Sequence, residues 1–175
     1  MRHARLILSL SVLLAGCVSP LVNFTPYSTP YFPKEEFERL FTSWKAGRAV
    51  AWEVRYKGSS FSEDELVVKS DGQGSLGPLL PTSTKQAKVF TVAKADLTRL
   101  VDKLVSSNVL SLYDGHYGAS TQSGGAGGAE VRLVVGGLEK RVSKDPGLSS
   151  ALSPEAGSIQ AASDAVLEVS RKYLK

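Results

Sequence analysis

The chain has 175 residues, of which 42% are hydrophobic, and this is the size and composition of a single globular domain. Its formal net charge is +4. Basic and acidic residues are interspersed and four Lys or Arg never occur in succession, which argues against a nucleic-acid partner. Cys17 is the single cysteine, so disulfides within the chain are excluded.

The first sixteen residues have the layout of a secretory signal. A basic start at Arg2 and Arg5 precedes residues 6–15, which are apolar apart from two serines, and Gly16 is small. The apolar stretch is shorter than the roughly 20 residues that a membrane-spanning helix needs. We therefore expect these residues to direct export and to be removed.

The end of this signal, Leu14-Ala15-Gly16-Cys17, resembles the lipobox of bacterial lipoproteins. The resemblance implies cleavage between Gly16 and Cys17, a diacylglycerol thioether on Cys17, and acylation of the new amino group with a fatty acid such as palmitate. Each buried methylene contributes about 0.8 kcal/mol, so several acyl chains anchor a protein stably. We expect attachment to the bacterial cell envelope through lipidated Cys17. Val18, in a position where aspartate favours the inner membrane, points to the outer membrane, facing the periplasm or the cell surface.

We divide the chain into a signal at 1–16, a lipid anchor and proline-rich tether at 17–33, and one domain at 34–175. Without Arg2 and Arg5 the chain has 19 basic and 17 acidic residues, so it is close to neutral. The prolines of the tether favour extended backbone, which could reach roughly 50 Å. Free aromatic rings would form a sticky surface, so we expect the tether's rings to pack on the domain. These rings are Phe24, Tyr27, Tyr31 and Phe32.

Apolar periodicity predicts three helices in the domain. The first runs from Pro33 to a stop at Gly47, the second covers Asp96–Ser107, and the third follows an N-cap at Ser153. Strands are expected at 49–56, 65–69, 74–76, 88–92, 130–135 and 138–142. Two-residue turns at Asp71-Gly72 and Gly136-Gly137 favour antiparallel pairing. The sequence thus predicts an α+β domain, with an antiparallel sheet of five to six strands and two to three helices mainly on one face.

The best candidate for a functional surface surrounds His116, the one histidine that the mature chain keeps. It lies at the start of the glycine-rich stretch 115–128, which we expect to form a loop. Since loops often carry binding residues, we predict that Tyr113, Asp114, His116 and Tyr117 contact a protein partner. As an alternative, His116 could act with Asp114 and a distant serine in a hydrolase, although no G-x-S-x-G motif surrounds a serine.

Other patterns predict no chemistry. One histidine and a lipidated cysteine cannot build a usual zinc site, so we expect no metal and no cofactor. The glycine pattern of residues 72–77 matches a dinucleotide fingerprint, but Pro78 forbids the helix that must follow it. The carboxylates of Glu63, Asp64 and Glu65 are expected to form a solvated edge rather than a calcium site.

The order of elements over roughly residues 50–170 resembles small secreted bacterial α+β domains such as emfourin-type protease inhibitors. The resemblance rests on the strand Trp52–Gly58, the turn at Asp71-Gly72, the Leu97/Leu100/Leu104 helix, Leu112-Tyr113 and the hairpin Val131–Val142. It implies protease inhibition as an alternative function, with Gly58-Ser59-Ser60 in place of the paired glycines of that group. Our main expectation is a non-enzymatic, protein-binding or structural role in the envelope.

Overall fold

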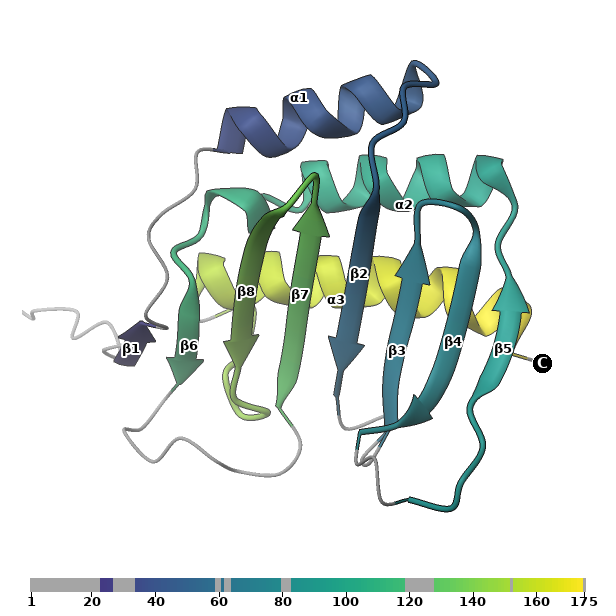
Figure 1. The fold of residues 1–175 in the computed structure, drawn as a ribbon. Helices are drawn as coiled ribbons and strands as arrows, with labels where there is room; N and C mark the ends of the chain where they lie inside the picture. The colour runs from purple at the N-terminus through teal and green to yellow at the C-terminus, as the bar shows by residue number, and fades with distance from the viewer. Residues whose placement is uncertain are drawn as a thin grey trace, which may run out of the picture.

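The computed structural model describes residues 23–26, 34–58, 61, 64–79, 83–118, 128–151 and 153–174, and its fold is α+β, as predicted. In these residues, three α-helices accompany one open, mostly antiparallel sheet (Figure 1). The helices are α1 (Lys34–Lys45), α2 (Lys94–Ser106) and α3 (Pro154–Tyr173), and a 3-10 turn, η1, covers Val109–Ser111. The strands are β1 (Asn23–Pro26), β2 (Trp52–Lys57), β3 (Asp64–Lys69), β4 (Gln73–Pro78), β5 (Lys88–Thr91), β6 (Gly115–Gly118), β7 (Ala129–Val135) and β8 (Leu138–Lys144).

The sheet is larger than the sequence predicts. Seven strands form its body in the order β6-β8-β7-β2-β3-β4-β5, and the short β1 extends it beyond β6. Every neighbouring pair is antiparallel except β6 and β8. The expected number of five to six strands is therefore wrong. The strands that the sequence did not predict are β6 and β1, which fall in the stretches interpreted as loop and tether. Neither strand shows apolar alternation in its sequence. Each is a strand because it pairs with the strands beside it.

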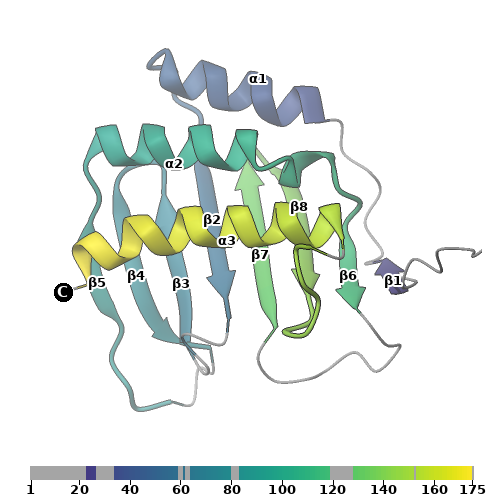
Figure 2. The same ribbon diagram turned by 180° about the vertical axis from the view of Figure 1, so that it is seen from behind.

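Helices α2 and α3 lie side by side across one face of the sheet, which confirms the predicted layering (Figures 1 and 2). Helix α1 packs on α2, η1 and β7, above the upper end of the sheet. Its predicted apolar face is buried through Phe37, Phe41 and Trp44. These rings reach the sheet at Trp52, whose ring centroid lies 5.1 Å from that of Trp44.

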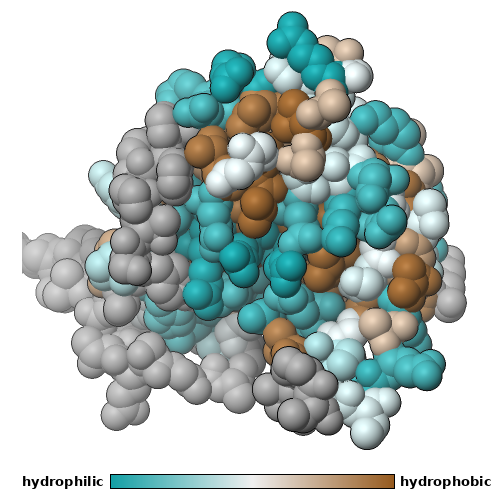
Figure 3. Space-filling model, in the orientation of Figure 1, coloured by the Kyte–Doolittle hydropathy of each residue, from teal (hydrophilic) through white to brown (hydrophobic). Residues whose placement is uncertain are grey.

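Side-chain alternation decides which face of each strand enters the core. In β2 the side chains of Trp52, Val54 and Tyr56 are buried against the helices. Fully burying one such side chain contributes roughly 1.5–3 kcal/mol, so a register shift by one residue would be very costly. The alternate side chains form the opposite face, which we call the open face; Figure 3 shows hydrophilic residues across its middle.

Turns and caps occur where the sequence predicts them. The backbone of Gly72 has φ +93° in the β3–β4 turn, and Asp71 Oδ1 accepts a hydrogen bond from Gln73 N at 2.9 Å. Gly74 and Gly77 belong to β4, so the glycine pattern serves a hairpin and not a helix start. At the start of α3, Ser153 Oγ accepts a hydrogen bond from Ala156 N at 3.1 Å, as an N-cap does.

Candidate functional site

The four residues predicted to contact a partner lie on or just before β6, and the structure gives them different surroundings. Tyr113 is 63% exposed, whereas Asp114 and Tyr117 are buried and His116 is partly buried. The hydroxyl of Tyr117 donates a hydrogen bond to the carbonyl oxygen of Tyr113 at 3.0 Å. The four side chains therefore do not form one exposed surface, and their contact with a partner stays a prediction.

Asp114 forms a buried ion pair with Lys140 of β8. Lys140 Nζ lies 3.0 Å from Asp114 Oδ1, and the two side chains are 0% and 1% exposed. Lys140 Nζ also donates a hydrogen bond to the carbonyl oxygen of Leu112 at 2.5 Å. Removal from water raises the pKa of the Asp114 carboxyl above its usual value, and the neighbouring Lys140 limits the rise. This pair holds the segment that leads into β6, and it is shielded from any partner.

His116 lies on the open face, between a serine and a carboxylate. Its Nδ1 is 2.8 Å from Ser143 Oγ, and its Nε2 is 3.0 Å from Asp145 Oδ1. The side chains of His116 and Asp145 are 16% and 17% exposed, and Ser143 is buried. The structure therefore corrects the carboxylate that the sequence suggested: Asp145, and not Asp114, is the partner of His116.

This arrangement depends on the parallel pairing of β6 with β8, which sets His116 beside Ser143. Ser143 and Asp145 lie 27 and 29 residues after His116, so no local motif connects them. Chemically, a histidine between a hydroxyl and a carboxylate can take a proton from the hydroxyl while the carboxylate orients the ring. The same three groups can equally tie the edge strand β6 to the end of β8 as a structural hydrogen-bond network.

A second feature of this edge is a cluster of aromatic rings. Phe24 of β1 is 40% exposed, and its ring centroid lies 4.9 Å from that of Tyr117 and 6.3 Å from that of Tyr113. Phe24 thus packs on the domain, as expected of the tether's rings. Its three counterparts, Tyr27, Tyr31 and Phe32, lie outside the described residues.

The open face has a network of ion pairs centred on β2. Arg55 is held by Glu53 and by Glu65, the latter at 3.1 Å, and these carboxylates raise the pKa of its guanidinium. On β7 and β8, Arg132 pairs with Glu139 and Arg141 with Glu130, each at 2.8 Å. The surface is thus neutralised locally, and it presents planar guanidinium groups in fixed positions.

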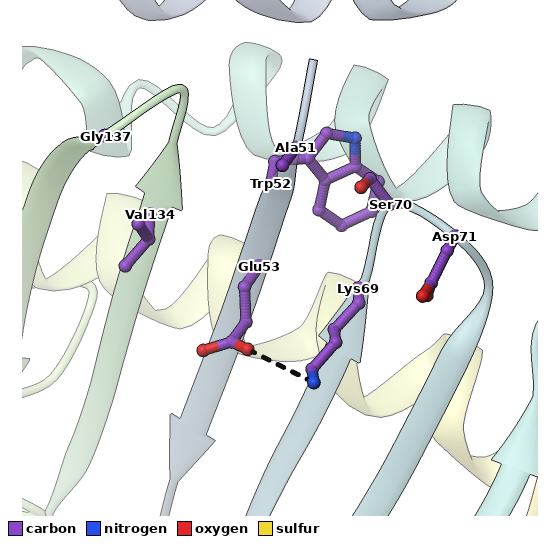
Figure 4. A pocket seen from close by; sticks show the side chains of 8 residues that line it. All are labelled: Ala51, Trp52, Glu53, Lys69, Ser70, Asp71, Val134 and Gly137. Atoms are coloured by element: carbon purple, nitrogen blue, oxygen red, sulfur yellow. Dashed lines mark ion pairs between the residues drawn. The ribbon is translucent and has the colours of Figure 1, made fainter. Parts of the chain in front are cut away.

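A pocket of about 330 Å³ lies at the upper end of the open face (Figure 4). Glu53 and Lys69, 4.0 Å apart, point toward one another on one side of it, and Ser70 and Asp71 come from the β3–β4 turn. Val134 and Gly137 line it from β7 and the following turn. This volume is at the lower end of the range for small-molecule sites, and such a pocket also suits a side chain of a protein partner.

The opposite face has a smaller hollow of about 170 Å³ between α2 and α3. Asp96 lies at its centre. Its Oδ2 accepts hydrogen bonds from Lys172 Nζ at 2.6 Å and from Tyr173 Oη at 2.5 Å, and its Oδ1 pairs with Arg99 at 3.1 Å. The hydrogen bond from Lys172, followed by that from Tyr173, lowers the pKa of Asp96. Because these charges satisfy one another, the cluster joins two helices and offers little to a ligand.

The remaining predictions concern metals, acidic residues and the membrane. Asp64 is buried and paired with Lys85, whereas Glu65 lies on the open face, so these two carboxylates do not converge; Glu63 lies outside the described residues. Within the described ranges, no group of three or more His, Cys, Asp or Glu side chains is placed to hold a metal ion. No helix in this same part of the chain has the length and apolar character to cross a membrane. Gly16 and Cys17 lie outside the described residues. So do Ser59 and Ser60, which stand in place of the paired glycines of the emfourin-type inhibitors.

Comparison with known proteins adds no family. No family model matches the chain, and no curated protein matches it.

Proposed function

We propose that this protein is a lipid-anchored component of the bacterial cell envelope whose domain binds another protein and catalyses no reaction. The observation that carries the proposal is the lipobox Leu14-Ala15-Gly16-Cys17. Lipidation of Cys17 fixes the domain on a membrane, where a binding module gains effective concentration toward other envelope proteins.

The lipid anchor is tested first, by intact mass and by palmitate labelling of the wild type and of Cys17→Ala. We expect the wild type to start at Cys17 with added acyl mass and to incorporate palmitate, and Cys17→Ala to lose both. A wild type without lipid would refute the anchor.

The open face is the surface that we assign to the partner. One face of the sheet is covered by α2 and α3, and the other presents fixed arginines next to a pocket. Arginine is enriched where proteins bind one another, and shallow pockets receive the anchoring side chains of partners. The partner is expected to carry both acidic and basic groups, because the open face carries both.

Site-specific photocrosslinking in intact cells tests this surface. A photoreactive residue at Val67, which lies on the open face of β3, should give a discrete protein adduct. The matched control is Asp164, an exposed position of α3 on the opposite side of the molecule. Equal adducts from both positions, or none from Val67 in a protein that is lipidated, would refute the assignment.

A second candidate function, a serine hydrolase, is supported by the hydrogen bonds that join Ser143, His116 and Asp145. In this reaction Ser143 Oγ would attack an acyl carbonyl and pass its proton to His116 Nδ1, while Asp145 stabilises the imidazolium at Nε2. The proton then goes to the leaving group, and water hydrolyses the acyl-enzyme by the same route.

A fluorophosphonate probe distinguishes the two candidates. A hydrolase would be labelled on Ser143, would lose the label in Ser143→Ala, and would keep it in Ser75→Ala, a serine on the same face of the sheet. Our main proposal predicts no labelling of the wild type. Protease inhibition stays a prediction from the resemblance alone.

A further inference from the structure

The strand β1 limits how far the domain can stand from the lipid. Asn23 of β1 pairs with Gly118 of β6, and it lies six positions after Cys17 in the chain. A fully extended chain spans at most about 3.6 Å per residue, so the reach from Cys17 to β1 is no more than about 22 Å. This is less than half of the reach of roughly 50 Å that the whole tether would have in the extended state. The β1–β6 edge is therefore the part of the sheet nearest to the anchor.

This edge also exposes two aromatic rings beside one another. Phe24 and Tyr113 are 40% and 63% exposed, with ring centroids 6.3 Å apart. Of the described residues, the other large exposed hydrophobic side chains are Leu79, after β4, and Val89 of β5. The aromatic pair thus lies at the tethered edge, whereas the exposed aliphatic residues lie toward the opposite edge.

We propose that Phe24 and Tyr113 rest in the headgroup region of the membrane that holds the Cys17 lipid, so that the sheet stands on its β1–β6 edge. The inference rests on the proposed lipidation of Cys17. A tyrosine ring suits this region because its apolar body enters the boundary of the acyl chains while its hydroxyl stays hydrated. The short link to the lipid keeps both rings near the surface, so a small gain per ring is enough to orient the domain.

Two structural contacts support a rigid edge. The hydroxyl of Tyr117 is hydrogen-bonded to the carbonyl oxygen of Tyr113, and the ring of Tyr117 packs on Phe24. The exposed rings are therefore joined to the sheet through a buried residue. Seven strand spacings of about 4.8 Å then place β5 roughly 34 Å from β1, beyond the reach of the headgroups. In this orientation the open face stands upright on the membrane and is accessible from the side.

Quenching of a tryptophan by brominated lipids tests the orientation. Full-length lipidated protein is reconstituted in vesicles of phosphatidylethanolamine and phosphatidylglycerol, with and without brominated acyl chains. The native tryptophans, Trp44 and Trp52, are buried and supply a constant background. Tyr113→Trp is the reporter at the tethered edge, and Val89→Trp, 77% exposed on β5, is the matched control.

We expect the tryptophan of Tyr113→Trp to shift to shorter wavelength and to lose most of its added emission in brominated vesicles, with Val89→Trp unchanged. If both reporters behave alike, quenched or unquenched, while the protein floats with the vesicles and carries its lipid mass, the orientation is wrong and the anchor stands. If the purified protein has no lipid mass, the proposed function fails and this inference fails with it.

Discussion

Replacing Lys140 by methionine should lower the free energy of unfolding more than removal of any of the surface ion pairs. The variant keeps the volume of the side chain but leaves the Asp114 carboxyl buried without its cation, since both side chains are at most 1% exposed. Breaking a buried pair costs about 3–5 kcal/mol, and the carbonyl of Leu112 also loses its donor. We expect a loss of about 4 kcal/mol, which lowers the Tm by roughly 10–15 °C for a domain of this size.

The assay is urea unfolding followed by the fluorescence of Trp44 and Trp52, both buried in the core. The matched control is the double variant Asp114→Leu with Lys140→Met, which removes both charges. Because an apolar pair needs no desolvation of ions, the double variant should recover most of the loss, and the cost that remains, about 1–2 kcal/mol, comes from the unpaired carbonyl of Leu112. A single variant that loses less than about 1 kcal/mol, or a double variant that loses the sum of the two single ones, would refute the reasoning.

The pH dependence gives an independent check. Burial raises the pKa of Asp114, so the carboxyl binds a proton more tightly in the folded than in the unfolded protein. Such a group destabilises the fold as the pH rises above the ordinary carboxyl pKa. The free energy of unfolding of Lys140→Met should therefore approach that of the wild type as the pH falls toward about 4, because protonated Asp114 needs no cation. A deficit that grows on acidification would contradict this account.

Three further predictions use the same unfolding assay. Gly72→Ala should lower the free energy of unfolding by about 2 kcal/mol, because φ is +93° and the new Cβ would lie 2.9 Å from the carbonyl oxygen of Val92. Its control is Gly137→Ala, which has a similar φ of +90° but open space around the new Cβ and should lose about half as much. Tyr173→Phe removes the hydroxyl that donates to Asp96 and should lose about 1 kcal/mol. The lowered pKa of Asp96 adds stability that disappears as the pH falls from the ordinary carboxyl range through the folded value, so Asp96→Asn should be less sensitive to acid there.

The predictable part of the fold consists of elements whose pattern is repeated along the chain. Phe37, Phe41 and Trp44 follow helical spacing, and all three are buried on α1. Trp52 and Val54 alternate with charged residues, and they face the core of β2. In such elements one buried face imposes the period, so a single stretch of sequence contains the information.

The strands β1 and β6 could not be predicted in this way. Residues 115–118 read Gly-His-Tyr-Gly, which is typical of a loop, and β1 ends at Pro26. These segments are strands because β6 is flanked by β8 and β1, and this pairing supplies the hydrogen bonds that the local sequence does not demand. The parallel pairing of β6 with β8 is likewise not set by a turn motif, because β7 lies between these two strands in the chain.

The sequence by itself predicts a lipobox at Cys17, and it determined the three amphipathic helices and the hairpin turns, because each depends on residues that are neighbours along the chain. The tertiary structure decided what surrounds the predicted site residues. It pairs Asp114 with Lys140, 26 positions later, and joins His116 to Ser143 and Asp145, 27 and 29 positions later. Which charges and hydrogen-bonding groups pair depends on their distance in space and on their exposure to water. Both are fixed only when the sheet has assembled.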